Sequence, residues 1–149
     1  MRNIIVIGGI IVLLVAGVWW SRSASTDKGE VISKSGIHWH STLHVYNKGE
    51  KMAIPADIGV GPQYASVRTF DTQMGMAAVH THAADGVIHL EFPGMVLEED
   101  TTLGNFFAIW GRDSMDFGSS VRMTVNGEES EELLNYRMRD GDVIELRYE

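Results

Sequence analysis

Three of the six histidines stand close together in the sequence, at His80, His82 and His89. They flank the Asp-Gly dipeptide at 85–86, which lies between residues that favour strands and predicts a β-hairpin with a type I′ turn. In that register His82 faces His89 and His80 faces Glu91. Strand side chains alternate between faces, so these four share one side, with opposed Cβ atoms about 4.5–5.5 Å apart. Three imidazoles and a carboxylate at this spacing predict a transition-metal site.

A second His-x-His pair, His38 and His40, lies in a predicted strand over residues 37–46, which also carries His44 on the same face. Histidines two apart on a strand are about 6.6–6.8 Å apart and can lean onto one ion. His38 and His44 are about 20 Å apart by the same rise, so they cannot share one ion. His44 is therefore a ligand of a further site or an ordinary surface residue. His38 and His40 join the hairpin histidines if the two His-x-His strands lie side by side, which depends on the strand order.

The ligand types narrow the choice of metal. The sequence has no cysteine, which leaves histidine, carboxylate and methionine as ligands. Met74 and Met76 precede the hairpin and are further candidate ligands. Thioether prefers Cu(I) and imidazole holds Cu(II), so copper is the first expectation and zinc the second. The alternative role for these methionines is to fill the core.

Glu91 is expected to orient a ligating histidine. If the protein is an enzyme, three imidazoles leave a fourth position on the metal for water, and Glu91 is a candidate base. This alternative is a metal-dependent hydratase, hydrolase or redox enzyme. A metal-free interaction module whose histidines sense pH is the other alternative. Because no Ser-His-Asp site, phosphate loop or dinucleotide fingerprint is recognisable, we favour metal binding, sensing or transfer over turnover.

Residues 4–20 carry no charge, follow Arg2 and end in Trp19-Trp20. Spanning a bilayer takes about 20 residues, with about 17 as the lower limit, and paired Trp is typical of the membrane boundary. We therefore predict a short flank (1–3), a transmembrane signal anchor (4–20), a flexible linker (21–36) and an extracytoplasmic metal-binding domain (37–149). A cleaved signal peptide ending near Ser23-Ala24-Ser25 is the alternative. Both place the domain outside the cytoplasm, and the anchor makes it a single-pass protein of the cell membrane.

The formal net charge of −8 argues against nucleic acid and anionic lipid surfaces as partners. The expected partners are the membrane, through the N-terminal helix, and another extracytoplasmic metal-handling protein.

The remaining pattern predicts an α+β fold, with a mixed or antiparallel sheet and one main helix. Strands are expected over 37–46, 51–54, 67–70, 121–125 and 143–148, and a helical turn within 128–136. Thr102 is a candidate N-cap for a helix to Trp110, and Gly111 stands where a C-terminal cap belongs.

The C-terminal part resembles the β-grasp (ubiquitin-like) fold, especially its small sulfur-carrier branch. The resemblance rests on Val-Asn-Gly at 125–127 and on Asp-Gly-Asp-Val-Ile-Glu-Leu at 140–146. The Gly-Gly tail that carries sulfur in that branch is missing before Glu149. The resemblance therefore implies topology rather than sulfur transfer.

Four motifs extend over more of the chain: HWHxxLxVYxxG at 38–49, IPAxIG at 54–59, HTHxxDGxIHLE at 80–91 and TLGxFFxxWG at 102–111. In this order they resemble a largely uncharacterised group of bacterial and archaeal membrane-tethered proteins. The resemblance implies the domain limits and histidines that act together, and it implies no particular activity.

Overall fold

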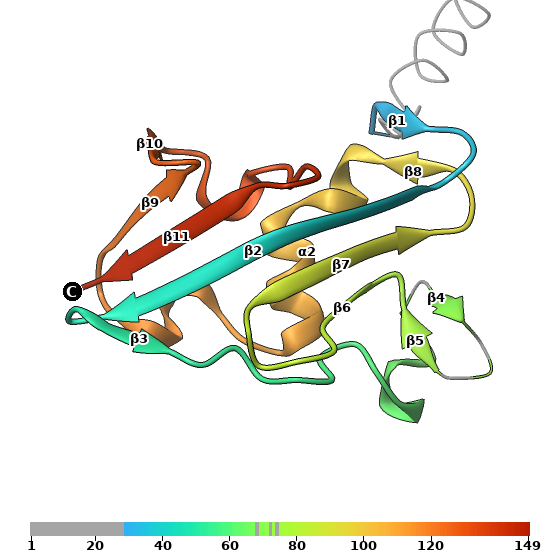
Figure 1. Ribbon diagram of the computed structural model, residues 1–149. Helices are drawn as coiled ribbons and strands as arrows, with labels where there is room; N and C mark the ends of the chain where they lie inside the picture. Colours follow the sequence, from blue (N-terminus) through green and yellow to red (C-terminus); the bar gives the residue numbers. More distant parts are fainter. Residues whose placement is uncertain (1–28, 68, 72, 74) are drawn as a thin grey trace, which may run out of the picture.

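The computed structural model describes residues 29–67, 69–71, 73 and 75–149, which fold around one seven-stranded sheet (Figure 1). The strand order is β10-β9-β11-β2-β7-β6, and β3 also pairs with β2. The strands are β2 (Ile37–Asn47), β3 (Glu50–Met52), β6 (Val79–His80), β7 (Val87–Phe92), β9 (Val121–Val125), β10 (Glu128–Ser130) and β11 (Val143–Tyr148). Over these described residues the fold is α+β with one main helix, as predicted.

The long strand β2 is the centre of the sheet. It pairs in parallel with β11, antiparallel with β7 along its first half, and antiparallel with β3 near its end. Strand β9 continues the sheet antiparallel to β11. The two halves of the chain therefore meet at the parallel β2–β11 pair. The two His-x-His segments do not lie side by side, because β7 lies between them.

Helix α2 (Leu103–Trp110) begins and ends where the sequence predicts. The Thr102 side chain accepts a hydrogen bond from the Asn105 N–H, as an N-cap does. Gly111 ends the helix in the left-handed conformation, with φ of 72°. Leu103, Phe106 and Phe107 are buried in the core. Short 3₁₀ turns occupy Pro62–Tyr64, Glu98–Thr101, Ser114–Phe117 and Leu133–Asn135.

The apolar core lies on one face of the sheet, the face that packs against α2. Alternate residues of the three central strands are fully or almost fully buried there: Leu43 and Val45, Ile88 and Leu90, Ile144 and Leu146. Because strand side chains alternate, the intervening residues of β2 and β7 project from the opposite face. That face carries the histidines.

Two small sheets lie outside the main one. Strand β1 (Val31–Ser33) pairs with β8 (Val96–Leu97), and β4 (Thr69–Asp71) pairs with β5 (Met76–Ala77). Strand β1 falls inside the segment predicted as linker 21–36, so paired structure is present before Ile37. Within the described part of the chain no helix is both long and apolar enough to span a bilayer, and the predicted anchor 4–20 lies outside it.

The predicted register of the histidine hairpin is wrong by two residues. His80, not His82, faces His89, and Val79 faces Leu90. Asp85 does not take the positive φ of a type I′ turn, although Gly86 does with φ of 90°. Instead the Asp85 carboxylate accepts the Val87 N–H at 2.9 Å at the end of a longer loop. A shift of two residues keeps every side chain on its face of the sheet. The prediction that the hairpin histidines and Glu91 share one side is therefore unaffected.

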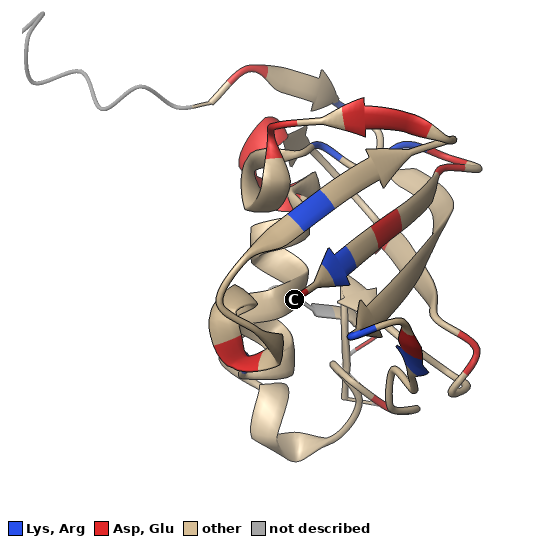
Figure 2. Cartoon of the chain, turned by 90° about the vertical axis from the view of Figure 1, so that its left-hand side faces the viewer, with Lys and Arg blue, Asp and Glu red and all other residues tan. Residues whose placement is uncertain are grey.

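The segment 128–136 holds the predicted helical turn only at Leu133–Asn135, because Glu128–Ser130 form β10. The turn before β10 is the expected one, since Asn126 and Gly127 both have positive φ, 53° and 87°. Figure 2 shows acidic residues on this edge strand, where Glu128 and Glu129 are exposed. Charged side chains on a short edge strand oppose pairing with another chain.

Candidate metal centre

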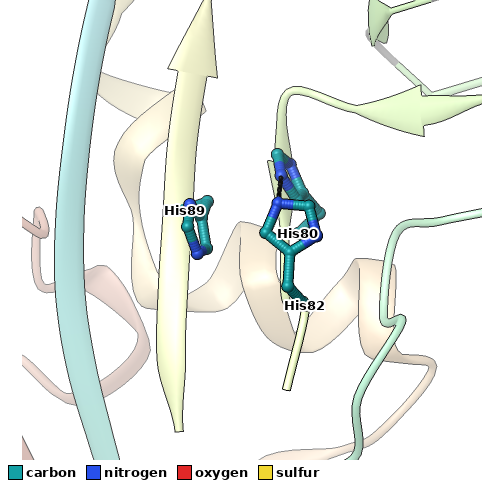
Figure 3. A group of neighbouring side chains, drawn as sticks. All are labelled: His80, His82 and His89. Carbon is teal, nitrogen blue, oxygen red and sulfur yellow. Dashed lines mark hydrogen bonds between the residues drawn. The ribbon is translucent and has the colours of Figure 1, made fainter. Parts of the chain in front are cut away.

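Three histidines converge where β6 meets β7 (Figure 3). His80 ends β6, His89 lies opposite it on β7, and His82 follows two residues after His80. One ring nitrogen from each can be chosen so that all three lie within 4.8 Å of one another. We call His80, His82 and His89 the inner cluster.

His80 is held as a metal-ligating histidine is commonly held. It is fully buried, and its Nδ1–H donates to the Ala77 carbonyl oxygen at 2.8 Å. Burial lowers the pKa of His80 from 6.5 to about 4, against an opposing effect of the Ala77 hydrogen bond. The imidazole is therefore neutral near pH 7, with its Nε2 lone pair free to accept a proton or a metal.

The Nε2 atoms of His80 and His82 are 3.2 Å apart. In the metal-free protein the Nε2–H of His82 donates to Nε2 of His80, because the proton of His80 is on Nδ1. Two imidazole nitrogens on one tetrahedral zinc ion, each about 2.0–2.1 Å from it, are about 3.3 Å apart. An ion can therefore replace this proton without large movement of either ring.

His89 completes the inner cluster and connects it to a carboxylate. Its ring centroid lies 4.5 Å from that of His82 and 5.2 Å from that of His80. Its Nδ1–H donates to Oε1 of Glu91 at 3.4 Å. Burial lowers the pKa of His89, and neighbouring His82 lowers it further, while Glu91 opposes this. The arrangement leaves Nε2 as the ligating atom and gives Glu91 the orienting role expected from the sequence.

The residue between the two histidines fixes their direction. Thr81 is fully buried, its hydroxyl donates to the Pro55 carbonyl at 2.9 Å, and it accepts the Ile58 N–H at 3.1 Å. The Thr81 N–H also donates to the Ile58 carbonyl at 2.9 Å. Because Thr81 faces inward, His80 and His82 both face the opposite side. These bonds to 55–58 also take the chain away from β7 after His80, which explains the shifted register.

Two further residues shape the wall beside His80. Gly59 has φ of 77°, and a Cβ there would lie 2.5 Å from the Val79 carbonyl oxygen and 3.0 Å from Cβ of His80. Only glycine allows the 56–61 loop this close to β6. The Phe70 ring stacks on His80, with ring centroids 6.4 Å apart and an interplanar angle of 20°.

A second group of donors lies on the same face. His38, His40 and Glu91 can offer one ligand atom each within 4.8 Å of one another. His40 faces His89 across the β2–β7 pair and His38 faces Glu91. Nε2 of His38 is 3.3 Å from Oε1 of Glu91, and the rings of His40 and His89 meet edge to face at 4.6 Å. We call His38, His40 and Glu91 the outer cluster.

The Asp-Gly-Asp motif positions β2 beneath this cluster. The His40 N–H donates to Oδ1 of Asp140 at 2.9 Å, and the Gly141 N–H donates to the His40 carbonyl at 2.8 Å. Asp142 itself is buried and accepts three hydrogen bonds, from Asn126, Tyr136 and the Arg139 N–H. The motif that suggested a fold thus also fixes the backbone of a candidate ligand.

The remaining predicted residues lie elsewhere. His44 shares the face of His40 but lies opposite Glu145 on β11 and belongs to neither cluster. Met76 is buried in β5, outside both clusters, and Met74 is outside the described residues. Sequence reasoning missed Gly59 and Phe70, since nothing local in the sequence relates them to His80.

Comparison with models of protein families, with curated proteins and with solved structures found no match to this chain. The chemistry of the site must therefore be inferred from its own residues. The five imidazoles and the one mostly buried carboxylate of the two clusters can coordinate transition metals.

Proposed function

We propose that this protein is a membrane-tethered, extracytoplasmic transition-metal-binding protein that binds its ion at the inner cluster, for storage, sensing or transfer. The observation that carries the proposal is the oriented His80, with Nδ1 bonded to Ala77 and Nε2 facing His82 at 3.2 Å. Structural histidines rarely gather in threes with their nitrogens this close, since each must find a separate hydrogen-bond partner.

Copper is the preferred ion and zinc the next. The inner cluster offers only imidazole, which suits both, and for a given nitrogen site Cu(II) binds more tightly than Zn(II). Met76 no longer contributes to this preference, because it is buried in another sheet, and Met74 lies outside the described residues.

The membrane tether, the extracytoplasmic location and the resemblance to known folds and families are part of the proposal. The tether rests on the uncharged residues 4–20, and the extracytoplasmic location follows from reading them as an anchor. The order β7-β2-β11-β9-β10, with a parallel central pair and a helix between β7 and β9, supports a β-grasp domain. We keep the resemblance to the membrane-tethered group, and a metal-handling protein as partner, as proposals.

Metal titration of the full-length chain in detergent micelles tests the proposal. Cu(II), Cu(I) and Zn(II) are each added while binding is followed calorimetrically, with His82→Ala as the test variant and His44→Ala as the matched control. His82 is exposed, so its replacement leaves the core intact. The proposal expects tight binding that His82→Ala weakens at least tenfold and His44→Ala leaves unchanged. Binding unaffected by His82→Ala, or no binding, would overturn it.

A metal-dependent enzyme is the second candidate, because the His89–Glu91 hydrogen bond provides the carboxylate–histidine pair that orients ligands in catalytic zinc sites. Three imidazoles also leave a coordination position for water, whose pKa zinc lowers to about 7. Zinc-dependent hydration of CO₂ or hydrolysis of a simple ester, lost in His82→Ala, would establish this candidate. Metal binding without turnover of either substrate favours the binding protein.

A further inference from the structure

The open face of the sheet carries more donors than one ion needs. The inner cluster uses His80, His82 and His89, while His38 and His40 lie on β2, opposite Glu91 and His89 of β7. The outer cluster is thus a complete three-donor set by itself. It differs from the inner one in having an oxygen donor.

The structure assigns a second transition-metal site to His38, His40 and Glu91, coupled to the first through Glu91, so that the sheet face holds a two-ion centre. This inference rests on the proposed function, since the inner cluster supplies the first ion. The two nitrogens and one carboxylate oxygen of the outer site suit a divalent ion, Cu(II) or Zn(II), better than Cu(I).

Glu91 is the link between the two sites. Its Oε1 lies 3.3 Å from Nε2 of His38 and 3.4 Å from Nδ1 of His89, while its side chain is only 8% exposed. A carboxylate this buried requires donors or cations. It is the one acidic residue of the two clusters, so it offsets the charge of an outer ion directly and that of an inner ion through His89.

Each site combines one exposed histidine with one half-buried and one buried ligand. The His38 side chain is 64% exposed, that of His89 is 19% exposed, and His80 is fully buried. The His40–His89 contact at 4.6 Å joins the outer cluster to the inner one. Either site can therefore receive an incoming ion through its exposed histidine, His82 in the inner cluster or His38 in the outer one.

The test measures stoichiometry and proximity on the full-length chain in detergent micelles. Zn(II) content after removal of excess ion is expected to be two per chain, falling to one in His38→Ala and one in His82→Ala. His44→Ala, which removes a histidine from the same strand face, is expected to keep two. With Cu(II), the electron paramagnetic resonance spectrum of the doubly loaded protein is expected to show dipolar broadening that His38→Ala abolishes.

The other possible results distinguish failure of the second site from failure of the proposed function. One ion per chain in the unaltered protein and in His38→Ala, with none in His82→Ala, overturns the second site while the proposed function stands. Two ions retained in His38→Ala, or two Cu(II) ions without dipolar broadening, also overturn the two-ion centre. Absence of bound ion in the unaltered protein overturns both proposals.

Discussion

Nε2 of His80 lies 3.2 Å from Nε2 of His82, although successive same-face residues of a regular strand are about 6.6–6.8 Å apart. The strand ends at His80, and the hydrogen bonds of Thr81 to the 55–58 segment turn the next residues. The two rings can therefore meet above His89. This local departure from strand geometry converts a spaced pair of imidazoles into a chelating pair.

We predict that the metal-free protein loses stability between pH 6.5 and pH 4. The pKa of His80 is lowered to about 4 in the folded state, so the unfolded chain binds a proton in this window that the folded chain does not. Proton binding thus stabilises the unfolded state relative to the folded state as pH falls, and the loss of unfolding free energy due to His80 approaches about 3 kcal/mol at pH 4. The pKa of His89 is lowered too and acts in the same direction.

Urea unfolding at several pH values, with a chelator present, measures this effect. His80→Asn is the comparison, since its amide can donate a hydrogen bond but does not titrate in this range. The variant should show a smaller loss of unfolding free energy between pH 6.5 and pH 4.5 than the unaltered protein. Equal losses in the two proteins would contradict the assigned role of His80.

Gly59→Ala should destabilise the fold and weaken metal binding. The new Cβ would lie 2.5 Å from the Val79 carbonyl oxygen, and φ of 77° is unfavourable for alanine. We expect a loss of about 2–4 kcal/mol in unfolding free energy from clash and backbone strain together. Gly49→Ala is the matched control, since its φ is 85° but no atom lies within 4 Å of the added Cβ. Its cost should be about 1 kcal/mol. Similar losses in denaturant unfolding for the two variants would refute the close approach.

Glu91→Gln should lower metal affinity at the inner cluster while preserving the fold. The amide keeps the size of the side chain but loses the charge that orients His89. Loss of such a carboxylate partner typically costs 10- to 100-fold in affinity. Glu145→Gln, on the same sheet face but paired with Arg147, is the control and should leave the affinity unchanged. Competition titration with a chromogenic chelator gives both values when it is carried out on His38→Ala, in which the outer cluster is incomplete. Equal affinities with and without Glu91→Gln would contradict the role of Glu91.

Local sequence patterns predicted the elements well. Strand β2 was predicted from the alternation over 37–46, helix α2 from the caps Thr102 and Gly111, and a tight turn from Asn126-Gly127. Each of these elements depends on contacts between near neighbours. The common face of the histidines was predictable for the same reason. The strand-pairing register at His80 was not, since it depends on hydrogen bonds between Thr81 and a segment more than twenty residues earlier.

The composition of the site could be predicted only in part. The sequence suggested His80, His82, His89, His38, His40 and Glu91, and the structure brings all six onto one face. The sequence did not show that β7 would separate the two His-x-His segments. This separation divides the donors into two clusters. Phe70 and Gly59 act through long-range packing, which periodicity does not encode.

The central claim is that His80, His82 and His89 bind one ion through Nε2. Long-range proton–nitrogen NMR of the imidazole rings, recorded on His38→Ala with one equivalent of Zn(II), tests this most directly because the outer cluster is then incomplete. We predict a metal-induced shift of Nε2 in these three histidines, with Nδ1 of His80 and His89 still protonated. Shifts confined to His40 or His44, or unchanged Nε2 signals of the three, would contradict the claim.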